Sequence, residues 1–169
     1  IGDYDTLYRG DYMRSGVVER AAGLARMIDV NWDIVEIGAG RGDLARIMAT
    51  LGYHWTAYDV VSNERVIAGQ LPSIRGQIPW RRYQCSVLVD VLEHIPEPDI
   101  METMVDLKHV AKRGVWAVAN MCDKHRISGD DVELHLTRRS PEWWQDQIAQ
   151  QCGASVVHQI DSSRFWLEV

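Results

Sequence analysis

The sequence predicts an α/β fold: an open, Rossmann-like sheet, mostly parallel, with helices on both faces and an antiparallel hairpin at its C-terminal end. Short apolar runs alternate with longer segments of helical periodicity, which is the order of a parallel sheet with crossover helices. A glycine-rich turn joins the first run to the next helix, and the last two runs, 155–160 and 164–169, are close enough to pair. At 169 residues the chain is one domain, 1–169, with a single core.

Each predicted element follows from its local pattern. Apolar residues recur at helical spacing over 10–29. Ser140 and Pro141 occupy the N-cap and first positions of the last helix, which Gly153 ends. The predicted strands are 33–37, 54–60, 85–92 and 114–120, and the predicted helices are 10–29, 42–52, 98–112 and 140–153.

Composition and charge exclude several classes of function. A formal net charge of −6 argues against a broad nucleic-acid footprint, and the basic clusters at 81–82, 124–126 and 138–139 are small. No apolar run approaches the roughly 18 residues of a membrane span. The three cysteines form no CxxC pair, so we expect a reduced, cytoplasmic protein that binds neither membrane nor nucleic acid.

Polar residues and glycines follow most of the predicted strands. They are the loop 38–42, Asp59, the segment 90–94 and Asn120. In open sheets of this kind, ligands bind outside the carboxyl ends of the strands, where the strand order reverses. We therefore expect these four places to converge on one ligand.

The glycine loop favours a ligand that has a positive group and no phosphate near the loop. The dinucleotide fingerprint is GxGxxG, but here the pattern is GxGxG and Asp43 takes the place of the last glycine. A carboxylate there repels pyrophosphate, and Glu36 adds negative potential. Asp59 lies 17 residues beyond Gly42, near the separation of an acid that holds a ribose. A ribose with a cationic tail describes S-adenosylmethionine better than NAD.

The stretches "VEIGAGRGDL", "YDV" and "VLVDVLEHIPEP" together resemble the class I S-adenosylmethionine-dependent methyltransferases over about residues 32–120. The "DVLEHI" segment is similar to the branch that acts mostly on small molecules. It does not resemble the DPPY or NPPY motif of DNA amino-methyltransferases.

The resemblance implies a set of cofactor contacts. Glu36 would orient the cofactor's amino group, and Asp59, with Val60 beside it, would bind the ribose. The resemblance implies two further groups of contacts. Gly38, Gly40 and Gly42 would line the methionine tail, and Asp90, Val91 and Leu92 would lie beside the cofactor. His94 would face the acceptor, and we add Tyr8 and Tyr12 of the N-terminal arm as residues that close over the cofactor.

Residues 61–82 depart from the family's pattern. They show weak periodicity, so we expect a short helix near 63–69 and a rudimentary third strand. The family's acidic adenine contact is not recognisable there. The candidates for adenine contacts are Leu71, Ile74, Ile78 and Trp80.

The polar segment 121–139 is predicted to form one wall of the acceptor pocket. Nineteen residues are a long connection for a small α/β domain, and such loops are usually functional or disordered. His135 is expected to point inward, and it or His94 is the candidate general base, because imidazole titrates near neutral pH. Asn120 and Arg138 are candidate acceptor contacts. Asp123, His125, Asp131 and His135 match no fixed ligand template, so no metal is expected.

The sequence thus predicts an enzyme that transfers a methyl group from S-adenosylmethionine to an oxygen or nitrogen of a small molecule. We divide its domain into an N-terminal arm and helix (1–30), a cofactor-binding half (31–120) and a part with the acceptor loop, last helix and hairpin (121–169). A nucleotide or RNA methyltransferase and a non-catalytic S-adenosylmethionine-binding protein remain as alternatives. A nicotinamide-dependent oxidoreductase is a third, which Asp43 disfavours. Closure of the pocket by a second copy of the chain, as a homo-oligomer, also stays open.

Overall fold

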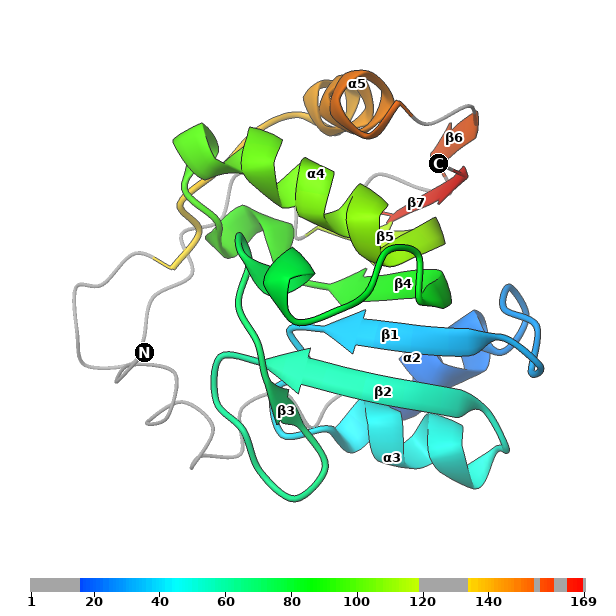
Figure 1. The fold of residues 1–169 in the computed structure, drawn as a ribbon. Helices are drawn as coiled ribbons and strands as arrows, with labels where there is room; N and C mark the ends of the chain where they lie inside the picture. Colours follow the sequence, from blue (N-terminus) through cyan, green and yellow to red (C-terminus); the bar gives the residue numbers. More distant parts are fainter. Residues whose placement is uncertain (1–15, 119–133, 154–155, 160–163, 169) are drawn as a thin grey trace.

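One open sheet with helices on both faces forms the molecule (Figure 1). This computed structural model describes residues 16–118, 134–153, 156–159 and 164–168. Within these ranges, seven strands follow the order β3-β2-β1-β4-β5-β7-β6. They are β1 (Asp33–Ile37), β2 (His54–Asp59), β3 (Ile67–Ala68), β4 (Tyr83–Val89), β5 (Ala111–Ala117), β6 (Val156–Gln159) and β7 (Arg164–Glu168). β7 runs antiparallel to β5 and β6, and the other pairs are parallel, which confirms the predicted fold class.

The helices cover both faces of the sheet. They are α2 (Val17–Leu24), α3 (Asp43–Thr50), α4 (Ile100–Val110) and α5 (Pro141–Cys152). α4 and α5 pack on one face, and α2 and α3 pack on the other. In the described residues, no helix is long and apolar enough to cross a bilayer.

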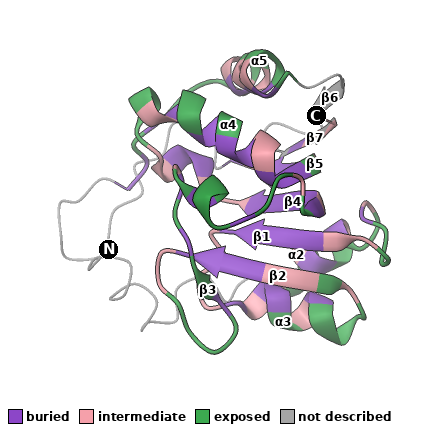
Figure 2. Cartoon of the chain, viewed as in Figure 1, coloured by how far each residue is buried: buried purple, intermediate pink, exposed green. Residues whose placement is uncertain are grey.

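Two apolar layers explain why the central strands are continuous apolar runs. In β1, Val35 and Ile37 face the layer under α4, whereas Ile34 faces the layer under α2 and α3. Strands that are buried on both faces need apolar residues at successive positions. Figure 2 shows this as buried residues along β1 and β4, with exposed residues on the outer sides of the helices.

The last helix has the ends that the sequence predicted. The Ser140 hydroxyl accepts a hydrogen bond from the Trp143 backbone N–H (3.2 Å), and Pro141 is the first helical residue. Gly153 follows the last turn with a left-handed φ of 60°. Trp144 is buried in the core, as expected for one of two adjacent tryptophans.

Several predicted elements differ from the observed ones. The helix predicted over 98–112 ends at Val110, and the strand predicted over 114–120 is observed at Ala111–Ala117. The helix predicted over 10–29 is described from Val17 and ends at Leu24, but Ile28 still packs in the same core, which is why the apolar spacing continued. The strand predicted over 85–92 ends at Val89, because Asp90 has a φ of +55° and cannot continue it.

The predicted short helix near 63–69 is absent from this described stretch. Asn63 and Val66 form an isolated antiparallel bridge instead, and the Asn63 side chain accepts a hydrogen bond from the Arg65 N–H (2.8 Å). An asparagine that bonds the backbone two residues on favours a turn over a helix. The third strand is only two residues long, so its prediction as rudimentary is confirmed.

Candidate active site

The site lies where the strand order reverses. β1 has β2 on one side and β4 on the other, so the loops that leave β1 and β4 diverge and open a crevice at their carboxyl ends. In Figure 1 these ends lie on the side to which the arrowheads of β1 and β2 point. Gly38 begins the loop after β1 with a φ of +78°, and a Cβ there would collide with the Val91 side chain. The two loops therefore meet so closely that only glycine fits.

The glycine loop is held to the end of β2. The N–H groups of Gly38 and Ala39 donate to the Tyr58 carbonyl at 2.8 and 3.0 Å. The Gly40 N–H donates to the Asp59 carboxylate at 2.8 Å. These bonds give the loop its shape within the chain itself.

A pocket opens beside this loop, between α2 and α3. Its lining residues come from α2, β1, the glycine loop, α3 and β4, and they are Val17, Arg20, Glu36, Gly38, Ala39, Gly40, Arg41, Asp43, Leu44 and Val89. Two guanidinium groups and two carboxyl groups thus line one small space. The expectation drawn from the sequence considered only the two carboxyl groups and neither of the arginines. The observed mixture suits a ligand end that carries both a carboxylate and an ammonium group.

Glu36 is the buried acid of this pocket. It is 5% exposed, and one carboxyl oxygen accepts a hydrogen bond from the Trp55 indole N–H at 2.7 Å. Burial raises the pKa of Glu36 to about 8, the Trp55 bond opposes that rise, and the Asp59 carboxylate adds to it. A carboxyl group in this state is largely neutral at pH 7 and ionises when a cation binds beside it.

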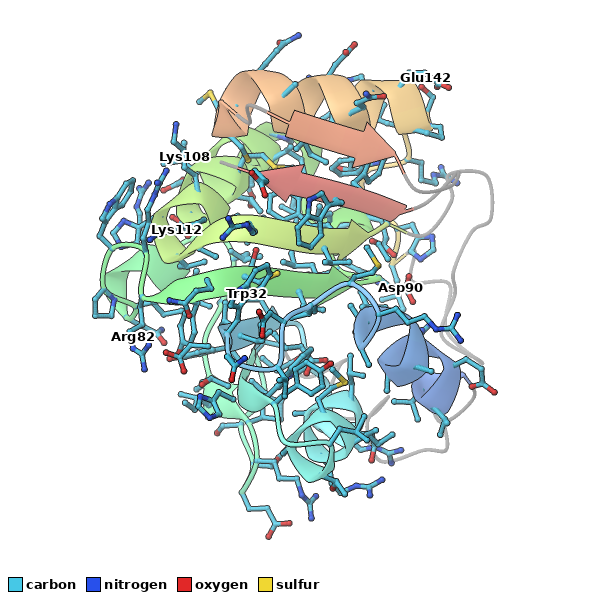
Figure 3. All side chains as sticks on the ribbon, turned by 90° about the vertical axis from the view of Figure 1, so that its right-hand side faces the viewer. Trp32, Arg82, Asp90, Lys108, Lys112 and Glu142 are labelled. Carbon is cyan, nitrogen blue, oxygen red and sulfur yellow. The ribbon has the colours of Figure 1, made fainter. Side chains whose placement is uncertain are left out.

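Arg20 is a site residue that the sequence analysis missed. Its guanidinium contacts the Asp90 carboxylate at 2.9 Å, and the two residues are 70 positions apart. Figure 3 shows Asp90 beside α2 at one end of the sheet, with Arg82 at the other. The sequence held one indication that Arg20 belongs to the site: it is a cation on the helix face that buries Ala21 and Leu24.

Asp59 holds the glycine loop, a role that was not predicted from the sequence. It is 3% exposed, and its two oxygens accept from the Gly40 and Val61 N–H groups at 2.8 and 3.2 Å. These bonds fix the carboxylate at the end of β2, and its contact with a ribose stays a prediction. Val60 follows it, half-buried, at the same strand end.

His94 and His135, the two candidate general bases, lie side by side. Their ring centroids are 5.1 Å apart, with an interplanar angle of 72°. His94 is in the turn Leu92–His94 after β4, and its Nδ1 lies 2.9 Å from the Leu134 carbonyl oxygen. Thr137 joins the two segments by donating its N–H to the Glu93 carbonyl (3.0 Å). The catalytic role of either histidine stays a prediction.

Other candidate residues are placed differently or lie outside the described residues. Arg138 is exposed, and the neighbouring Arg139 makes an ion pair with Glu97. Asn120, Tyr8 and Tyr12 are outside the described residues, as are Asp123, His125 and Asp131.

The adenine candidates divide into three core residues and one exposed tryptophan. Leu71, Ile74 and Ile78 belong to the core under α4. Trp80 lies against His109, with ring centroids 5.1 Å apart, near the start of β5 and so at the opposite end of the sheet. These residues were proposed because they are apolar and follow β2; Leu71, Ile74 and Ile78 fill the core, whereas Trp80 is exposed.

The two cysteines that the structure describes are not nucleophiles. Burial raises the pKa of the Cys85 thiol, and of the Cys152 thiol, to about 12. Both are therefore neutral thiols near neutral pH, and covalent chemistry through a thiolate has no support in the described site.

The structure is an open α/β sheet with a mixed-charge pocket at its switch point. Comparison with known families agrees: residues 8–162 match the family model described as "Methyltransferase domain". The chain belongs to this methyltransferase family, and its cofactor is S-adenosylmethionine. None of the curated proteins compared with the chain matches its sequence.

Solved methyltransferases share the fold at low identity. One is the 1,6-didemethyltoxoflavin-N1-methyltransferase of Burkholderia thailandensis with bound S-adenosylhomocysteine: TM-score 0.69, 12% identity, covering 99% of this chain and 84% of that one. An S-adenosylmethionine-dependent methyltransferase from Aquifex aeolicus has a TM-score of 0.61 and 12% identity, covering 97% and 96%. The mitomycin 7-O-methyltransferase MmcR has a TM-score of 0.64 and 15% identity, covering 98% and 59%.

Proposed function

We propose that the protein methylates an oxygen or nitrogen of a small molecule, with S-adenosylmethionine as donor. The observation that carries this proposal is the adjacency of two sites. A mixed-charge pocket lies at the glycine loop, and the turn that contains Val91 leads from it to His94 and His135. The first suits a cofactor and the second suits an acceptor. Similar solved structures include an N1-methyltransferase and a 7-O-methyltransferase of small molecules.

The pocket residues fit the methionine end of the cofactor. Glu36 would take the ammonium group, since a positive charge favours the ionised carboxylate that burial disfavours. The Arg20 guanidinium, 2.9 Å from Asp90, would donate hydrogen bonds to the cofactor's carboxylate from its planar fork. Asp59 would hold the ribose hydroxyls while its bond to the Gly40 N–H shapes the loop.

The chain's main task in the reaction is alignment. When bound, the cofactor supplies an electrophilic methyl group on a sulfonium. Positioning of two reactants can contribute about 7–11 kcal/mol to lowering a barrier. The segments that carry His94 and His135 are joined by hydrogen bonds, so they would hold the acceptor in a fixed place. The proton that the acceptor loses would leave on the side of these two histidines.

Turnover on a panel of acceptors tests the proposal. The purified protein is incubated with S-adenosylmethionine and with small phenols, alcohols, amines and ring nitrogens, and formation of S-adenosylhomocysteine is measured. Methylation of a member of the panel is the expected result. Methylation of RNA or nucleotides alone, or cofactor binding without turnover on any acceptor, would contradict it.

A further inference from the structure

A cluster of ligand-type side chains lies beside the cofactor pocket, at the turn after β4. Among the described residues, Glu93, His94 and His135 bring one carboxylate oxygen and two ring nitrogens within 4.8 Å of one another. Glu93 is 1% exposed and His135 8% exposed, and His94 is half-buried. No metal was expected from the sequence, because the candidate ligands considered there all lie in the segment 121–139 and do not include Glu93.

The two segments that carry this cluster are braced against each other. The Thr137 N–H donates to the Glu93 carbonyl at 3.0 Å, and the Thr137 hydroxyl donates to the Ile95 carbonyl at 2.7 Å. Two residues further on, Arg139 bonds both carboxylate oxygens of Glu97. The backbone around the three side chains is therefore held in place without a ligand.

His94 is oriented as a metal ligand usually is. Its Nδ1 lies 2.9 Å from the Leu134 carbonyl oxygen. A carbonyl oxygen only accepts, so Nδ1 carries the proton and Nε2 carries the lone pair. Histidines that bind metals almost always donate their other N–H to a carbonyl, a carboxylate or water, which fixes the ring and its tautomer.

We propose that Glu93, His94 and His135 bind one divalent first-row transition-metal ion, such as Zn²⁺, Co²⁺ or Mn²⁺. Two imidazoles and one carboxylate suit these ions, whereas Mg²⁺ and Ca²⁺ prefer oxygen ligands. With ligand distances of about 2.0–2.2 Å, two ligand atoms lie at most about 4 Å apart. The side chains thus close by about an ångström on binding. Three protein ligands leave coordination positions open, as in catalytic zinc sites.

The consequence for catalysis rests on the proposed function. In the metal-bound protein the two histidines are ligands and not general bases, which differs from the role predicted from the sequence. An acceptor hydroxyl oxygen takes an open position on the ion, which lowers the pKa of that hydroxyl so that its proton passes to solvent. The oxygen lone pair forms the new O–CH₃ bond, and the electron pair of the broken C–S bond stays on sulfur. Acceptors with two neighbouring oxygens would suit the site best.

Metal binding can be measured without cofactor or acceptor, so it succeeds or fails independently of methyl transfer. Tag-free, chelator-treated protein is titrated with Co²⁺ and with Zn²⁺, using calorimetry and the visible d–d absorption of Co²⁺. We expect one ion per chain. Glu93→Gln, His94→Gln and His135→Gln should each weaken binding by at least about tenfold.

Two matched variants control for the loss of a histidine or a glutamate elsewhere. His54→Gln changes a side chain that is 70% exposed and lies 3.4 Å from Asp33. Glu64→Gln changes a carboxylate that is 75% exposed and pairs with Arg65, outside the bracing of the cluster. Both should bind Co²⁺ like the wild type.

His135→Cys keeps the proposal testable even where the glutamine variants fold poorly. A thiolate in place of the imidazole should add a sulfur-to-cobalt charge-transfer band to the Co²⁺ spectrum. The proposal is overturned by a wild type that binds no stoichiometric Co²⁺ or Zn²⁺, by glutamine variants that bind as the controls do, or by a Co²⁺-loaded His135→Cys protein without that band.

Discussion

Glu36 places a titratable carboxyl group inside the cofactor pocket. Its pKa is raised to about 8, first by burial, against an ordinary value of 4.5. Between these two values the folded protein holds the proton and the unfolded chain has released it. The stability that the neutral carboxyl contributes is thus fully present below about pH 4.5 and is lost as the pH rises through about 8.

Replacement of Glu36 by glutamine should remove this pH dependence. The amide keeps an oxygen for the Trp55 N–H (2.7 Å in the wild type) but cannot ionise. We expect the wild type to lose stability between pH 5 and 8 relative to Glu36→Gln, in urea unfolding without cofactor. Cofactor affinity should fall in the variant, since the partner of the ammonium group is gone.

Glu97→Gln serves as the control for this comparison, since Glu97 pairs with Arg139 and is exposed. That variant should follow the wild-type pH profile. Identical slopes for the wild type and Glu36→Gln would show that Glu36 does not titrate in this range.

The Asp59 carboxylate holds the glycine loop, and in the proposed function it also binds the ribose of the cofactor. Asp59→Asn keeps the size of the side chain but removes its charge and one acceptor oxygen. Each hydrogen bond to a charged group is worth about 1.5–3 kcal/mol, so cofactor affinity should fall by about tenfold or more. Circular dichroism checks the fold, and calorimetry checks the affinity. An unchanged dissociation constant in a folded variant would refute the ribose contact.

The glycine turn between β1 and α3 is the element on which the pocket depends most. Gly38 has a φ of +78°, and a Cβ there would collide with the Val91 side chain. Gly38→Ala should therefore combine backbone strain, of about 1–3 kcal/mol, with overpacking, of about 1–3 kcal/mol. We expect reduced stability in thermal unfolding together with weaker cofactor binding.

Gly52→Ala is the matched control for Gly38→Ala. Gly52 has a φ of +90°, but a Cβ there would meet no atom within 4 Å. The Gly52→Ala variant should show the destabilisation from backbone strain alone and should bind the cofactor normally. The double variant with Gly38→Ala and Val91→Ala should recover part of the loss, because the collision is relieved. Equal destabilisation by Gly38→Ala and Gly52→Ala would argue against close packing of the two loops.

Among the elements, those with strong local signals were predictable from the sequence. Ser140, Pro141 and Gly153 marked the ends of α5, and continuous apolar runs marked the central strands. The end of β4 was not predictable, because the left-handed backbone of Asp90 (φ +55°) is set where two loops meet. The helix predicted from residue 10 ran past Leu24, since apolar spacing records burial and not backbone conformation.

At the scale of the whole molecule, the sequence located the site but not all of its chemistry. Strand order and strand ends placed the glycine loop, Asp59 and His94 at one edge, and motif resemblance named the cofactor. The Arg20–Asp90 pair joins residues 70 positions apart. The cluster of Glu93 with two histidines is likewise assembled only in three dimensions. Contacts of this kind carry no periodicity, so they follow from the fold alone.

Calorimetric titration of the purified protein with S-adenosylhomocysteine and, separately, with NAD tests the central claim most directly. That claim is that the mixed-charge pocket at the switch point is a cofactor site for a zwitterionic, phosphate-free ligand. We expect saturable one-to-one binding of S-adenosylhomocysteine and no binding of NAD. Saturable NAD binding without a response to S-adenosylhomocysteine would contradict it.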